Sequence, residues 1–171
     1  MAARITRTLY SFKRETNRTR HMRFLPETEK ILLKSGWQSG RSCGLGGQKA
    51  STNPFANAVI EEFGGLTLGA EGRGVDNYRE IVDFTHWKEF EDGYFDDDDR
   101  VPTKYSGLLL VEVASITQFN NAILIDQEGA AYIHGDFFRE SGCYKYPNGI
   151  DRLLEQILLG MKFDGSFLWS Y

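Results

Sequence analysis

The chain has 171 residues, of which 41% are hydrophobic and 13% aromatic, which is enough for one packed domain and excludes global disorder. Its longest apolar runs, such as Leu108–Val111, are as short as a strand, far below the roughly 18 apolar residues that a membrane-spanning helix needs. Residues 1–23 carry seven Lys or Arg and one acid, so the other 13 basic and 23 acidic residues give the rest of the chain a net charge of −10. Such an acidic body argues against nucleic-acid binding, because phosphate contacts need Lys and Arg, and it favours a basic protein partner.

The basic segment 1–23 is rich in Arg, Ser and Thr. Three interpretations compete for it: a transit peptide, a tail for nucleic acid or membrane, and a poorly ordered leader with Met22 as the true start. We favour the leader, which leaves residues 24–171 as a single folded domain. No apolar signal region is visible near the start, so we expect a cytoplasmic protein in which Cys43 and Cys143 are reduced thiols, with one disulfide as the alternative.

Two helices are expected first. Residues 24–36 have Pro26 in the first turn, acidic residues near the start and Gly36 as the stop, and Trp37 then folds back on the core. A glycine-rich loop over 38–53 follows. The second helix begins at the cap Asn53 and ends at Gly64 and Gly65.

Strands dominate the rest of the chain. We expect strands over 66–68 and 81–85, a central strand over 108–113, and a hairpin over 122–133 with Gly129 as its turn glycine. A last helix spans 149–159, and the aromatic tail 161–171 packs back on the domain. This order predicts an α+β fold, with an antiparallel or mixed sheet flanked by two N-terminal helices and one C-terminal helix.

No catalytic, cofactor-binding or metal-binding residue is predicted. The stretch Gly44–Lys49 lacks the spacing of a phosphate-binding loop, and the three histidines are isolated from metal-ligand patterns. Neither cysteine lies in a nucleophile motif, and the carboxylates occur in charge runs. We therefore expect a protein that is not an enzyme; an enzyme or metal protein whose site has no recognisable motif is the competing hypothesis.

The most conspicuous feature is an acidic and aromatic run between positions 89 and 99. A solvated loop is one interpretation, and a calcium loop fits poorly because the ligand spacing is wrong. The interface interpretation uses carboxylates to meet Arg and Lys of a partner and aromatic rings as anchors. The predicted partner-binding residues are Glu91, Asp92, Tyr94, Phe95, Asp96, Asp97, Asp98 and Asp99.

Four segments together resemble a known family. They are Phe24 to Arg41, Ala58 to Leu66, Ala122 to Tyr132, and Ile150 to Gly160. The first contains the string Pro-Glu-Thr-Glu and the pair Gly-Trp, and the second ends with Phe-Gly-Gly-Leu. In this order they are similar to the SUKH superfamily of immunity proteins, most closely its third subgroup. The resemblance covers about residues 24–160; the basic segment 1–23 and the tail lie outside it.

The resemblance implies an α+β fold and a bacterial protein that binds and neutralises a toxin of a contact-dependent or polymorphic secretion system, often a nuclease. It supplies no catalytic residues and no cofactor, and it does not locate the toxin-binding surface. Other members of the superfamily are regulatory or scaffold proteins, so a housekeeping partner is the alternative to a basic toxin domain. The oligomeric state stays open.

Overall fold

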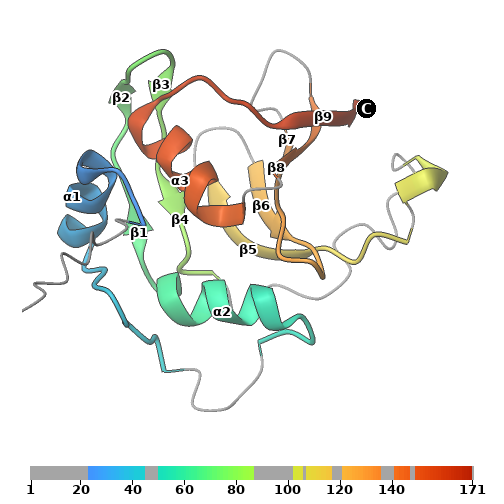
Figure 1. Cartoon of the computed structure of the whole chain (residues 1–171), viewed down its shortest axis with the longest axis horizontal. Helices are drawn as coiled ribbons and strands as arrows, with labels where there is room; N and C mark the ends of the chain where they lie inside the picture. The colour runs from blue at the N-terminus through green and yellow to red at the C-terminus, as the bar shows by residue number, and fades with distance from the viewer. Residues whose placement is uncertain are drawn as a thin grey trace, which may run out of the picture.

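The computed structural model describes residues 23–44, 50–86, 102–105, 107–116, 121–135, 141–146 and 149–170. The fold is α+β in a single domain, with three helices on a sheet that is antiparallel at every pairing (Figure 1). The helices are α1 (Pro26–Lys34), α2 (Pro54–Phe63) and α3 (Gly149–Leu159), with a short 3-10 turn, η2, at Thr103–Tyr105. No helix in these ranges is long and apolar enough to cross a membrane.

The main sheet has seven strands in the order β1-β4-β5-β6-β7-β8-β9. Their bounds are Thr67–Leu68 (β1), Val82–Asp83 (β4), Val111–Ile116 (β5), Asn121–Ile125 (β6), Ala131–Gly135 (β7), Gly142–Tyr146 (β8) and Ser166–Ser170 (β9). A separate two-stranded hairpin, β2 (Gly72–Arg73) and β3 (Tyr78–Arg79), lies beside the end of α3, where the Val75 N–H donates to the Leu159 carbonyl.

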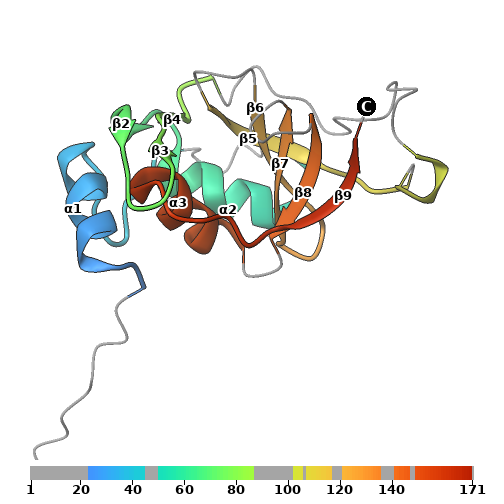
Figure 2. The same ribbon diagram turned by 90° about the horizontal axis from the view of Figure 1, so that it is seen from above.

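Both faces of the sheet are covered, which explains why every residue of β6 is buried. Helices α2 and α3 pack on one face, and α1 packs against α3, as Figure 2 shows from above. Ile123 and Ile125 point into this helix-side core. On the opposite face Leu124 belongs to a smaller cluster with Trp169, whose ring contacts Tyr105 in a tilted arrangement with 4.6 Å between centroids.

The helix predictions are confirmed closely. Helix α1 ends in a Schellman motif, in which Gly36 has a φ of 88° and the Trp37 N–H donates to the Leu32 carbonyl. Trp37 is only 6% exposed, in edge contact with Phe24. Helix α2 begins at Pro54 after the cap Asn53, and α3 spans the predicted residues 149–159.

The strand predictions are confirmed in type but less well in position. The predicted central strand 108–113 is displaced, because the ladder starts where Val111 faces Ile125, the last residue of β6 before its turn. The hairpin with Gly129 is confirmed, and the tail does pack back, as edge strand β9. Strand β8 and the β2–β3 hairpin were not predicted, because their sequences contain glycine and charged residues that weaken a strand pattern.

Asn53 joins the start of α2 to the β6–β7 turn. Its side-chain oxygen accepts from the N–H groups of Phe55 and Ala56 at 2.9 and 3.1 Å. Its side-chain amide donates to the carbonyls of Ile125 and Asp126 at 3.3 and 2.9 Å. Because Asn53 is only 5% exposed, all of these partners depend on one buried side chain.

Replacing Asn53 therefore separates two contributions to stability. Asn53→Ala removes the cap and the link to the turn, and we expect a loss of about 2–3 kcal/mol in the free energy of unfolding, measured with urea. Asn53→Ser keeps an oxygen that can cap the helix but loses the amide donors, so its loss should be smaller. Equal losses in the two variants would mean that the cap contributes nothing.

Candidate functional site

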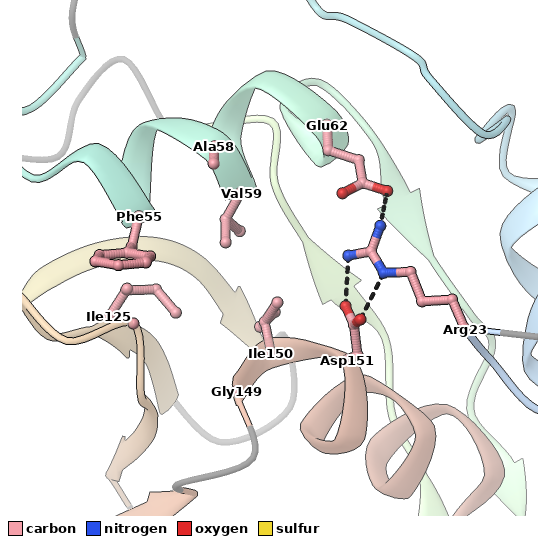
Figure 3. A pocket seen from close by; sticks show the side chains of 10 residues that line it. Arg23, Phe55, Ala58, Val59, Glu62, Ile125, Gly149, Ile150 and Asp151 are labelled. Carbon is pink, nitrogen blue, oxygen red and sulfur yellow. Dashed lines mark hydrogen bonds and ion pairs between the residues drawn. The ribbon is translucent and has the colours of Figure 1, made fainter. Parts of the chain in front are cut away.

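A pocket of about 250 Å³ opens between α2 and the beginning of α3 (Figure 3). We call it the α2–α3 pocket. It is lined by Arg23, Phe55, Ala58, Val59, Glu62, Ile125, Gly129, Gly149, Ile150 and Asp151. These residues come from four separate parts of the chain, so the pocket exists only in the folded domain.

The floor of the pocket is apolar. Phe55 and Val59 lie one turn apart on α2, so both side chains point to the same side of the helix. Val59, Ile125 and Ile150 are nearly buried, whereas Phe55 remains 47% exposed and offers part of its ring to solvent. A half-exposed aromatic ring beside a pocket is a common anchor point in protein interfaces.

The position of Phe55 depends on Gly129 in the β6–β7 turn. Gly129 has a φ of 84°, a conformation that favours glycine. A Cβ at this position would lie 2.8 Å from Cδ1 of Phe55, too close for a carbon–carbon contact. Glycine therefore serves both the turn and the close approach of the ring.

The rim of the pocket is charged. The Arg23 guanidinium donates twice to the Asp151 carboxylate, each bond 2.5 Å long, and once to Glu62 at 2.6 Å, as the dashed lines in Figure 3 mark. The Trp37 ring N–H donates to the same Glu62 oxygen at 2.9 Å. We call Arg23, Glu62 and Asp151 the Arg23 clamp; it holds two carboxylates and one cation, a net charge of −1.

Electrostatics favour the charged form of the Arg23 guanidinium. The hydrogen bonds to Asp151, more than the one to Glu62, raise the pKa of Arg23 above its already high value, although partial burial opposes this. Asp151 lies in the first turn of α3, where the positive end of the helix dipole stabilises a carboxylate. The clamp thus joins one cation with two carboxylates at the rim.

The structure does not describe the predicted partner-binding residues. Glu91, Asp92, Tyr94, Phe95 and Asp96 to Asp99 all lie outside the described residues, so the hypothesis of an acidic interface stays a prediction. Sequence reasoning missed the pocket itself. It assigned Arg23 to the basic segment 1–23, whereas the Arg23 side chain bonds to α2 and α3.

The described residues contain no group of three or more His, Cys, Asp or Glu side chains that could hold a metal ion. Cys43 and Cys143 are not joined by a disulfide. Burial raises the pKa of Cys143 to about 12, so its thiol stays protonated at neutral pH and is a poor nucleophile.

The carboxyl group of Glu112 has an unusually high pKa. Glu112 lies on β5 opposite Leu124, on the sheet face away from α2 and α3. Burial raises its pKa from the ordinary 4.5 to about 7. This group is thus largely neutral in the folded protein at mildly acidic pH.

Searches of protein-family models, of curated proteins and of solved structures find no match to this chain.

The Arg23 clamp should make a small, salt-sensitive contribution to stability. The Arg23 side chain is 45% exposed, so we expect Arg23→Ala to lower the free energy of unfolding by about 1 kcal/mol or less. The loss should shrink as salt is added, because ions screen exposed charges. Lys30→Ala on exposed α1 removes the same charge and serves as the control; an identical salt response of both variants would argue against a specific clamp.

Glu112 should make the stability of the wild-type protein depend on pH. Its folded pKa lies above its unfolded pKa, so the unfolded chain releases the proton first and stability falls between about pH 4.5 and pH 7. Glu112→Gln stays neutral and should lose this part of the dependence. Urea unfolding of both proteins across this range tests it, and parallel curves would contradict a raised pKa.

Proposed function

We propose that this chain is a non-catalytic protein-binding module, an immunity protein of the SUKH type that neutralises a cognate basic toxin domain by direct binding. A nuclease is the expected class of toxin, and the cytoplasm is the expected compartment. The protein would need no cofactor, because its action is to cover the toxin's active site or substrate groove.

The α2–α3 pocket is the observation that most supports this proposal. It joins an apolar floor, a half-exposed aromatic ring and a rim with excess negative charge. Interfaces are commonly organised in this way, with an apolar centre and a polar rim. The α+β order of the elements also agrees with the resemblance to the SUKH superfamily.

Charge gives the second line of support. The chain outside residues 1–23 carries −10, and the run from position 87 to 101 alone holds seven acids and two basic residues. An acidic surface attracts a basic partner over distances near the Debye length and accelerates their association. In this proposal the acidic run, with Tyr94 and Phe95 as anchors, contacts the toxin.

Capture followed by a toxicity assay tests the function. The full chain is used as bait in lysate of the source cells, and each captured protein is identified by mass spectrometry and expressed in a sensitive host. We expect a basic domain that kills the host and is neutralised when this chain is co-expressed. Capture of a non-toxic housekeeping complex would contradict immunity and favour the scaffold alternative.

A charge-matched pair of variants tests the acidic run. Replacing Asp96, Asp97, Asp98 and Asp99 with Asn should weaken binding of the purified toxin about tenfold or more and slow its association. The control changes four exposed acids elsewhere, Glu27, Glu71, Glu128 and Asp164, to their amides. Equal affinities for the two variants would exclude the run as the contact, because both lose the same charge.

A further inference from the structure

The α2–α3 pocket has the size of a side-chain site. Its volume of about 250 Å³ lies below the roughly 300–1,000 Å³ of pockets that enclose whole small molecules. A single long side chain from a protein partner fits this space. Such an inserted side chain is the usual anchor of a protein–protein interface.

The pocket rim already binds a guanidinium group, that of Arg23 within the same chain. The group forms a bidentate pair with Asp151 and a third hydrogen bond with Glu62. The three clamp side chains nevertheless sum to a net charge of −1, and the nearby Arg41 guanidinium donates to the main-chain carbonyls of Glu62 and Gly64. The side chains of Glu62 and Asp151 are 20% and 32% exposed, so a cation from outside can approach both carboxylates.

The floor suits the rest of an arginine side chain. Val59 and Ile150 offer apolar contacts for its methylene groups. Phe55 leaves part of its ring exposed beside them, which adds apolar surface for the same stem. A guanidinium presents a planar fork of donors that matches carboxylates, which an ammonium lacks. Charge and donor geometry therefore favour arginine over lysine or a purely apolar residue.

We infer that the α2–α3 pocket takes an arginine side chain of the protein partner, with its guanidinium at Glu62 and Asp151 and its stem over Phe55, Val59 and Ile150. This assignment rests on the proposed function, because it names the anchor by which a basic toxin domain would be held. In it Arg23 is a neighbour that shares the two carboxylates with the incoming arginine.

The test needs no knowledge of the partner. N-acetyl-arginine amide is titrated into the isotope-labelled full chain, and backbone amide shifts are followed by NMR, with the acetyl amides of lysine and norleucine as comparisons. We expect saturable shifts at Ala58, Gly149 and Ile150, strongest for arginine. Norleucine binding as tightly as arginine would overturn the assignment in favour of an apolar anchor.

Two variants of the clamp test whether its charge controls arginine binding. Glu62→Gln should weaken arginine binding up to about fivefold, as expected for a partly exposed charge pair. Arg23→Ala should strengthen it by a similar factor, because the rim charge changes from −1 to −2. A merely structural role of the clamp would not produce opposite effects from these two changes. Thermal unfolding of each variant confirms that the domain is intact.

A blocking variant tests whether the arginine shifts arise from the pocket. Ala58→Trp fills the pocket from the exposed side of α2 and should abolish the arginine shifts, whereas Ala70→Trp, at an exposed alanine outside the pocket, should not. Absence of saturable shifts in the wild type overturns the arginine site even if a toxin is found. Arginine binding without any toxin partner would instead reject immunity and leave the site standing.

Discussion

The hydrogen bonds accepted by the buried Asp126 carboxylate are the interactions on which the rest of this structure depends. Asp126 is fully buried at the β6–β7 turn and accepts four hydrogen bonds. Two come from the N–H groups of Glu128 and Ala130 in its own turn, one from the Tyr132 hydroxyl at 2.7 Å and one from the Lys145 ammonium at 3.1 Å. One side chain therefore shapes the turn and also ties β7 and β8 to it.

Burial by itself would raise the pKa of Asp126, but the hydrogen bonds from Tyr132, Ala130 and Lys145 outweigh it, so the pKa is lowered. Glu112 shows the opposite result on the same sheet, because its burial is not offset and its pKa rises to about 7. The contrast follows one rule: a carboxylate stays charged in a protein interior only where donors replace the lost water.

The β6–β7 turn positions one end of the α2–α3 pocket. The Asn53 amide donates to the carbonyls of Ile125 and Asp126, which fixes the start of α2 against the turn. Gly129 then lets Phe55 lie directly on the backbone. At the other end, the Arg23 clamp holds α2 to the first turn of α3. One end of the pocket is thus fixed by a buried polar network, and the other end by a partly exposed charge cluster. The side chains of the exposed cluster are less confined than those of the buried network.

Local signals in the sequence determined the helices, their caps and the hairpin. Pro26, Asn53 with Pro54, Gly36 and Gly129 act through neighbours a few residues away, so their effects can be read without the fold. These local signals also predicted the order of the helices and strands, and that order predicted the α+β class. The acidic excess outside residues 1–23 is likewise a property of the sequence alone.

Tertiary structure alone decided the pairing of β8 with β9, the burial of Asp126 and the existence of the pocket. Strand β8 contains Gly142 and Lys145 and is held by partners on both sides, which no local pattern encodes. The clamp joins residues 128 positions apart, Arg23 and Asp151. Such contacts depend on where the chain returns in space, and that is set by the packing of the whole core rather than by any short stretch of residues.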